Sequence, residues 1–181
     1  MKSLLLVCFV VIATHGKNYF EEYCWRDYEG VLPEDAVSGG LDTSGKLIFI
    51  GQVLFEGMLI PGKIFRNDKR IYIEWAGMEK ALEANIKVLC SSHAYKFDWL
   101  QTSNANFYLL HDKILIKGGY EPNFFTYIGR IKIGETVNIG KVICASDCLG
   151  LYTTKNGSLN LYTHFQVLAY NPLMEHANVI W

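Results

Sequence analysis

The chain repeats one sequence plan twice, and this duplication constrains its fold more than any other feature. The first copy carries Gly39-Gly40-Leu41-Asp42, Ile50-Gly51-Gln52, Ile60-Pro61-Gly62-Lys63 and Ile86-Lys87-Val88-Leu89. The second copy carries Gly118-Gly119-Tyr120, Ile128-Gly129-Arg130, Ile139-Gly140-Lys141 and Phe165-Gln166-Val167-Leu168. Gly51 is as far from Lys63 as Gly129 is from Lys141, a coincidence that chance rarely produces in so short a chain. The two copies are therefore expected to share one arrangement of strands.

Short β-branched and aromatic segments, bounded by Gly, Asn or Asp, predict an all-β fold. They occupy residues 47–50, 70–75, 114–116, 125–133 and 159–168. Alternation of apolar and polar residues over 159–167 predicts half-buried strands in antiparallel sheets, and only residues 78–84 have a helical character. A copy of about 70 residues cannot easily bury its apolar face alone. We therefore expect two tandem repeats forming paired antiparallel β-sheets with approximate twofold pseudo-symmetry.

The first residues have the form of a secretory signal, because Met1-Lys2 is followed by a short apolar run and by Gly16. We expect residues 1–16 to be a signal peptide, although a signal anchor is an alternative. No other stretch approaches the roughly 20 apolar residues of a membrane span. The mature chain is therefore expected to be secreted, extracellular and not inserted into a membrane.

Residues 17–181 are expected to form a single two-repeat β domain. Repeat one covers about 23–98 and repeat two about 99–170, with Trp25 and Trp99 at corresponding starts. Loss of the signal removes one lysine and no acid, so the formal charge falls from −1 to −2. Nucleic acid is not an expected partner, because phosphate binding requires a clustered basic surplus.

Export also determines what the cysteines mean. Cys24, Cys90, Cys144 and Cys148 remain in an oxidising compartment after the signal is removed. Four cysteines allow three pairings. A Cys24–Cys90 bridge would staple the first copy, and Cys144–Cys148 would close a tight turn; two free buried thiols are the alternative.

The sequence contains no strong enzyme or metal motif. The metalloprotease, phosphate-loop and serine-hydrolase motifs are absent. Cys24-Trp25 is a weak match to a papain-type nucleophile, and Cys144, Cys148 and His164 lack an evident fourth zinc ligand. We therefore predict a protein that is not an enzyme and that uses no metal or cofactor.

The candidate binding residues are Asp42 and Lys63. A carboxylate that accepts hydrogen bonds, beside an ammonium that donates them, suits the adjacent hydroxyls of a sugar. The neighbouring glycines would let the backbone approach a ligand, and Pro61 would stiffen the approach to Lys63. The structural alternative is a surface ion pair between two ordinary turns, worth under about 1 kcal/mol.

These residues lie in segments that resemble the DM-nine (DM9) repeat family, over about residues 23–170. The matching elements are Trp25, Pro33-x-x-Ala36-Val37-x-Gly39-Gly40-x-Asp42, Ile48-Phe49-Ile50-Gly51, Leu59-Ile60-Pro61-Gly62-Lys63 and Val88-Leu89. The family comprises invertebrate tandem-repeat proteins and includes the head module of natterin-like toxins. The resemblance implies paired antiparallel sheets and, in lectin members, mannose held by the acid after the double glycine and the lysine after the proline. Here those residues are Asp42 and Lys63.

The second copy departs from the family pattern. Counting back from Lys141 places Tyr120 where the acid should be, so Tyr120 and Lys141 would form a degenerate second site. Glu121 could replace the acid, but adjacent strand residues point to opposite faces. In the first copy, Gln52 replaces the arginine that usually follows the strand glycine, whereas Arg130 keeps it.

We therefore expect a secreted, non-catalytic mannose-type lectin of innate defence or microbial recognition. Its partners would be mannose-type glycans, including those of microbial surfaces, and a homodimer would supply multivalency.

Asn156-Gly157-Ser158 is an N-glycosylation sequon in a predicted turn, with an unmodified turn as the alternative. The other function hypotheses are a protein-interaction or structural module without sugar binding and a lipocalin-like carrier. The internal repeat disfavours the carrier, and pore formation would need a second, membrane-inserting module.

Overall fold

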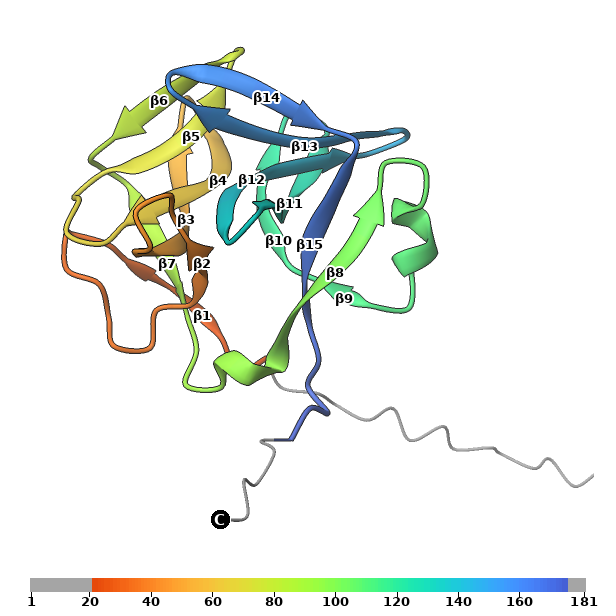
Figure 1. The fold of residues 1–181 in the computed structure, drawn as a ribbon, viewed down its shortest axis with the longest axis horizontal. Helices are drawn as coiled ribbons and strands as arrows, with labels where there is room; N and C mark the ends of the chain where they lie inside the picture. The colour runs from red at the N-terminus through yellow and green to blue at the C-terminus, as the bar shows by residue number, and fades with distance from the viewer. Residues whose placement is uncertain (1–20, 176–181) are drawn as a thin grey trace, which may run out of the picture.

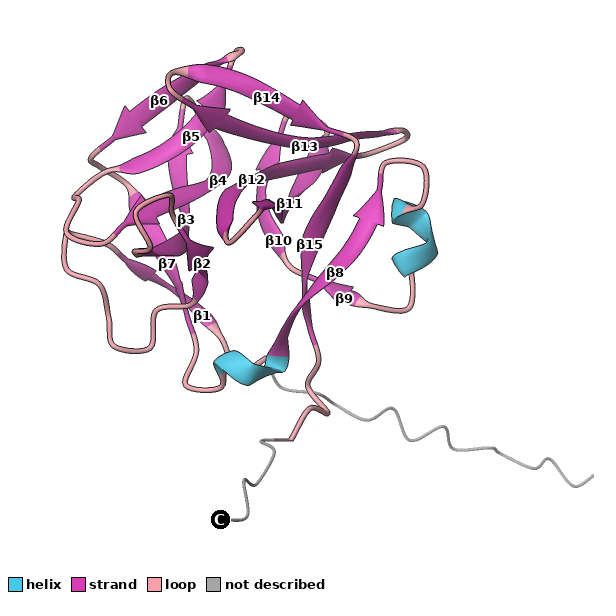
Figure 2. Cartoon of the chain, in the orientation of Figure 1, coloured by secondary structure: helices cyan, strands magenta, loops and turns pink. Residues whose placement is uncertain are grey.

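The computed structural model describes residues 21–175, and the predicted signal peptide lies outside them. The first copy contributes seven strands: β1 (Cys24–Asp27), β2 (Ser38–Leu41), β3 (Leu47–Phe55), β4 (Met58–Phe65), β5 (Ile71–Trp75), β6 (Met78–Leu82) and β7 (Ile86–Cys90). The second contributes β8 (Phe97–Ser103), β9 (Ile114–Leu115), β10 (Lys117–Glu121), β11 (Phe124–Ile133), β12 (Thr136–Cys144), β13 (Cys148–Lys155), β14 (Ser158–Tyr162) and β15 (His164–Tyr170). Two short 3₁₀ turns, η1 (Ala94–Lys96) and η2 (Phe107–Leu110), flank β8 (Figure 2). The all-β prediction is confirmed.

Both copies pair their strands in the same order. In the first, β1-β7-β3-β4-β5-β6 follow one another, and in the second β8-β15-β11-β12-β13-β14 do so. The two runs meet edge to edge where β6 pairs with β14 (Figure 1). Along the whole sheet, the strand order of the second copy is therefore that of the first copy in reverse. Gly51 lies opposite Gly62 on β4 just as Gly129 lies opposite Gly140 on β12. The spacing that revealed the repeat therefore reflects a shared strand register.

The hydrophobic core consists of three clusters, and the middle one joins the copies. One cluster lies within the first copy and one within the second. The middle cluster is built from corresponding buried residues of both copies: Val37 and Ile116, Ile50 and Ile128, Leu89 and Leu168. Trp25 and Trp99, opposite Leu89 and Leu168 in the register, pack against it from each side. Each copy thus completes its core against the other.

The double glycines lie at this junction. A Cβ on Gly39 would lie 2.2 Å from the Ile139 side chain, and a Cβ on Gly119 would lie 1.8 Å from the Leu59 carbonyl oxygen. In each copy the strand with the double glycine thus approaches β4 or β12 of the other copy. Gly119 is required because the backbone of the other copy lies directly beside it, whereas Gly39 leaves room for the Ile139 side chain.

The helical expectation for residues 78–84 is wrong, because Met78–Leu82 is strand β6. Ala76 and Gly77 have positive φ values of 52° and 83°, which is the geometry of a tight hairpin turn after β5. The register with β5 then fixes the segment as a strand. Within residues 21–175, no helix is long and apolar enough to cross a lipid bilayer.

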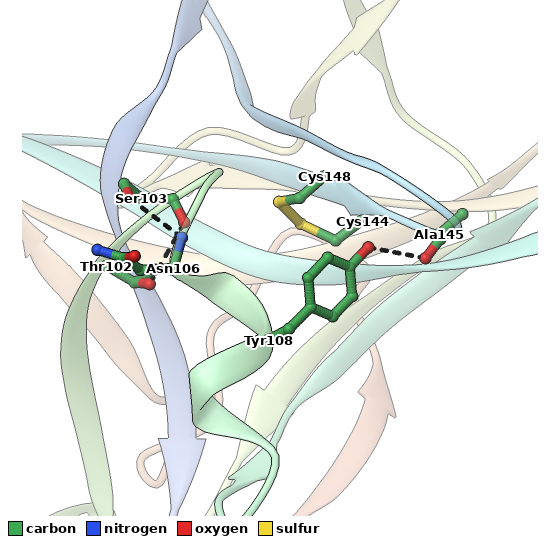
Figure 3. The surroundings of a disulfide bond; sticks show 7 residues. All are labelled: Thr102, Ser103, Asn106, Tyr108, Cys144, Ala145 and Cys148. Carbon is green, nitrogen blue, oxygen red and sulfur yellow. Dashed lines mark hydrogen bonds between the residues drawn. A yellow bond between two sulfur atoms is a disulfide. The ribbon is translucent and has the colours of Figure 1, made fainter.

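One of the two expected disulfides is present. Cys144 and Cys148 are bonded across the turn between β12 and β13, so neither is available to a zinc site (Figure 3). The Tyr108 hydroxyl, from η2, donates to the carbonyl oxygen of Ala145 inside this loop at 2.8 Å. Cys24 and Cys90 face each other in the register of β1 and β7, but both are free thiols. Burial raises the pKa of the Cys90 thiol to about 11, and the nearby Asp35 adds to this effect.

Removing the Cys144–Cys148 bridge should lower the free energy of unfolding by about 2 kcal/mol. The loss is at the low end for a disulfide because the bridge closes a very short loop and so restricts the unfolded chain only a little. The measurement is urea unfolding of a Cys144→Ser/Cys148→Ser variant against the native protein. A reducing agent should destabilise the native protein by a similar amount and leave the double variant unchanged. Equal stability of the two proteins under oxidising conditions would contradict this expectation.

Candidate functional site

A cavity of about 320 Å³ lies where the two copies meet, and it contains both predicted sugar-binding residues. Its lining comes from both copies: Asp42, Thr43, Ile48, Lys63, Phe65, Tyr72 and Glu79 from the first, and Ile133, Thr136, Val137, Asn138, Thr154, Lys155, Asn156 and Tyr162 from the second. A volume of this order suits a small ligand. We refer to this space as the inter-repeat cavity.

Asp42 follows β2 and caps its own turn. Its Oδ1 accepts hydrogen bonds from the Ser44 amide at 2.7 Å, the Ser44 hydroxyl at 2.8 Å and the Lys46 amide at 2.9 Å. Partial burial opposes ionisation, but these bonds outweigh it and lower the pKa of Asp42. No partner for Oδ2 is found among the described residues. Asp42 is thus a fixed carboxylate with one oxygen available to a ligand.

Lys63, on β4, is buried rather than on the surface, with 6% of its area exposed. Its Nζ donates to Asn138 Oδ1 at 2.9 Å and to the Thr154 carbonyl oxygen at 2.5 Å, and it lies 3.4 Å from Glu79 Oε2. Burial lowers the pKa of Lys63, although the Glu79 carboxylate opposes that effect. These partners match the three donors of an ammonium group. Lys63 therefore joins the two copies at the base of the cavity, and no ion pair with Asp42 is found in residues 21–175.

Aromatic rings form the apolar part of the wall. Phe65 and Tyr72 meet edge to face at 5.3 Å between ring centres, and Tyr162 lies on the same cavity. The Tyr72 hydroxyl donates to Asp68 Oδ2 at 2.8 Å. Partial burial and this carboxylate raise the pKa of Tyr72 to about 12, so the group stays protonated at neutral pH. The cavity thus combines carboxylates, amide and hydroxyl groups with ring faces.

The second lysine occupies the corresponding place but has different partners. Lys141, on β12, is 3% exposed, and its Nζ lies 3.0 Å from Glu74 Oε2 and 2.7 Å from Glu121 Oε1. Glu74 belongs to β5 of the first copy, so this lysine also reaches across the junction. Thr154, which accepts from Lys63, holds the position on β13 that corresponds to Glu74 on β5. Each lysine therefore contacts the equivalent strand of the other copy.

The register corrects the expectation that Tyr120 replaces Asp42. Leu41 pairs with Leu47, and Tyr120 pairs with Phe125, after the same bulge in both copies. Tyr120 therefore corresponds to Leu41, and Glu121 corresponds to Asp42. The residue count from the lysine is misleading because β10 turns directly into β11 through two residues, whereas the turn after Asp42 is longer. Tyr120 is exposed, as Leu41 is, and the Glu121 side chain contacts Lys141. Alternation therefore holds, and it places Glu121 on the side of the lysine because Glu121, not Tyr120, corresponds to Asp42.

Arg130 also has a role at the junction. Its guanidinium donates to the Gly39 carbonyl oxygen at 2.5 Å and to Gln166 at 2.8 Å, and it stacks on Trp99 at 4.3 Å. In the first copy Gln52 takes this position, opposite Lys87. The arginine that follows the strand glycine thus holds the copies together, and it does not line the inter-repeat cavity.

Sequence reasoning missed Glu79 and the cavity residues of the second copy other than Asn156, which it identified only as a glycosylation sequon. Asn138 donates to and accepts from groups at the base, and Thr154 Oγ1 donates to Glu79 Oε2 at 2.5 Å. These residues occupy no motif of their own, and each becomes part of the site only when the other copy packs against it. The single available signal was the repeat itself, which predicts a junction without giving its register.

A solved structure has a similar fold. It is the crystal structure of the nematode sperm cell motility protein MFP2B, with a TM-score of 0.59 and 9% sequence identity. The match covers 83% of this chain and 45% of that chain, so this chain spans less than half of that protein's length. At this identity the similarity shows the fold alone. No curated protein matches the chain in sequence.

A protein-family comparison identifies the first copy. The DM9 repeat model matches residues 9–82, which include Asp42 and Lys63, whereas the second copy lies outside the matched residues. The resemblance seen in the double glycine, the Pro-Gly-Lys segment and their spacing is therefore confirmed for the first copy. Residues 9–82 of the chain thus match the DM9 repeat family.

Proposed function

We propose that this protein is a secreted carbohydrate-recognition protein that binds mannose-type glycans in the inter-repeat cavity. The observation that carries the proposal is that Asp42 and Lys63, 21 positions apart in sequence, line one cavity of monosaccharide size. The DM9 match to the first copy is consistent with this recognition role. The proposal assigns no catalytic role to any residue.

The chemistry of the wall fits a neutral polyol. Asp42 Oδ2 is a charged acceptor, and such hydrogen bonds are stronger than those between neutral groups. Glu79 and Thr136 add further polar atoms, and the Phe65 and Tyr72 rings offer surfaces to the C–H groups of a sugar. Lys63 keeps its internal partners and positions Asn138 and Glu79 around the ligand. This divides the roles of the two predicted residues, with Asp42 binding the ligand and Lys63 building the site.

Useful avidity requires several cavities in one assembly. A single small cavity should bind a monosaccharide only at about the millimolar level. Multivalent display of such sites raises the overall affinity by about 10² to 10⁴. We therefore propose a homodimer or larger assembly acting on repetitive glycans, such as those of microbial surfaces, in innate defence.

Asp42→Asn should weaken binding to immobilised mannose-rich glycan at least about tenfold, a loss of ~1.4 kcal/mol. The amide oxygen can still accept the three bonds of the turn, so the loss reports the charge at the cavity rather than unfolding. Surface plasmon resonance on the purified protein is the measurement. Asp112→Asn is the matched control, because Asp112 is an exposed carboxylate that pairs with Lys113 outside the cavity.

Equal binding by native protein and Asp42→Asn would place any sugar site elsewhere. Failure of the native protein to bind any sugar, when it is produced without N-glycosylation, would favour the second candidate, a protein-interaction module. A row of apolar side chains on the surface favours that alternative. Leu54, Leu59, Tyr120 and Phe125 lie side by side across β3, β4, β10 and β11. The Leu54, Tyr120 and Phe125 side chains are 47%, 42% and 55% exposed, respectively. Together they form an apolar row on one face of the sheet.

A further inference from the structure

The N-glycosylation sequon lies at the inter-repeat cavity. Asn156 is exposed at the turn between β13 and β14 and is one of the residues that line this cavity. Its neighbours Thr154 and Lys155 line the cavity too, and the Thr154 carbonyl oxygen accepts from Lys63. A group attached to the Asn156 side chain would therefore start at the rim of the proposed sugar site.

The turn that carries Asn156 is short and fixed. Asn156 and Gly157 have φ values of 53° and 82°, the geometry of a two-residue hairpin turn. The Glu79 amide donates to the Gly157 carbonyl oxygen at 3.2 Å, and Ser158 pairs with Met78 of the first copy. Thr154 Oγ1 donates to Glu79 Oε2 on the cavity side of the same turn. The attachment point is thus held beside the cavity by contacts with β6.

We propose that N-glycosylation of Asn156 covers the inter-repeat cavity and regulates access to it. In the modification, the Asn156 Nδ2 forms a bond to C1 of an oligosaccharide carried on a polyprenyl pyrophosphate. The C1–O bond to the carrier breaks, the pyrophosphate leaves, and Nδ2 loses one proton. The attached glycan consists of many sugar units, each comparable in size with the cavity. The inference rests on the proposed function, because it assigns a regulator to that same site.

Covering follows from attachment and geometry together. A glycan on a long flexible loop could swing away from a nearby site, but the bonds of Gly157 and Ser158 to β6 hold this turn in place. Mannose units of the attached glycan would also be present at high local concentration beside Asp42. The glycosylated protein should therefore bind added mannose-type glycan poorly, and the unmodified protein should bind it fully.

The test compares three forms secreted from eukaryotic cells: native protein, Asn156→Gln, and Asn156→Gln combined with Phe125→Thr. The last form moves the sequon to Asn123, an exposed turn residue that does not line the cavity. Peptide mass spectrometry establishes glycan occupancy at each asparagine. We expect Asn156 to be occupied in the native protein, and we expect that form to bind mannose-rich glycan at least about tenfold more weakly than the other two. Enzymatic removal of the glycan should restore binding.

A second readout does not depend on sugar binding. Thr43 is exposed on the cavity lining, so a Thr43→Cys variant can be labelled with a maleimide and the rate measured peptide by peptide. Labelling should be slower when Asn156 is glycosylated and should recover after deglycosylation. An unoccupied Asn156, or equal labelling rates, would overturn the proposed covering. Slower labelling without sugar binding by any form would instead contradict the proposed function and leave the covering supported.

Discussion

Replacing Lys141 with alanine is expected to lower the free energy of unfolding by about 3 to 5 kcal/mol. Lys141 Nζ is the shared partner of the Glu74 and Glu121 carboxylates, and Lys141 and Glu74 are almost fully buried. Without the ammonium, two negative charges would remain close together with little water to solvate them. Thermal and urea unfolding at neutral pH would measure the loss.

The companion variant tests the cause. Lys141→Met combined with Glu74→Gln and Glu121→Gln removes all three charges, so it should recover much of the lost stability, as replacement of whole buried ion clusters does. Lys63→Ala provides the comparison at the equivalent position. It should cost less, because two of the partners of Lys63 are neutral and its carboxylate partner is 3.4 Å away. A loss below about 1 kcal/mol for Lys141→Ala would indicate an ion pair of the surface type.

The arrangement of the strands could be predicted because both copies keep the same spacing between their glycines and lysines. The interval between Gly51 and Lys63 sets a hairpin with a fixed register, and the same interval recurs at Gly129 and Lys141. The alternation of apolar and polar residues along β14 and β15 further predicted which side chains of these strands face the core. The composition of residues 78–84 favours a helix, whereas the hairpin turn at Ala76 and Gly77 makes the segment a strand. Long-range pairing overrides local propensity in sheets.

The site was predicted in part. That Asp42 and Lys63 share one cavity followed from the family resemblance, but the partners of Lys63 could not be foreseen. They depend on which strands meet at the junction, and that register is set by core packing between Ile50, Ile128 and their neighbours. The correspondence of Glu121 with Asp42 was hidden by a difference in turn length. A difference in turn length leaves the strand pairing unchanged, but it shifts the number of residues between any two positions on opposite sides of the turn.

Gly140→Ala is the second substitution with a large expected effect, about 3 kcal/mol or more. A Cβ at this position would lie 1.9 Å from the Tyr152 carbonyl oxygen, which belongs to the neighbouring strand β13. Gly62 has the same relation to the Tyr72 carbonyl oxygen, at 2.4 Å. Gly62, which the sequence suggested as a place for a ligand to approach, admits the adjacent strand instead. Relief of the contact would separate β12 from β13.

Gly134→Ala separates this steric effect from the general cost of replacing glycine. Gly134 has a positive φ of 63°, and a Cβ added there would have no neighbouring atom within 4 Å, so only the backbone preference is lost, at about 1 to 2 kcal/mol. Urea midpoints of the two variants should therefore differ clearly, with Gly140→Ala the less stable. Equal midpoints would show that β13 can move aside. Because Lys141 follows Gly140 directly, movement of β12 would also draw the ammonium away from Glu74, so the strand contact and the buried charge cluster should fail together.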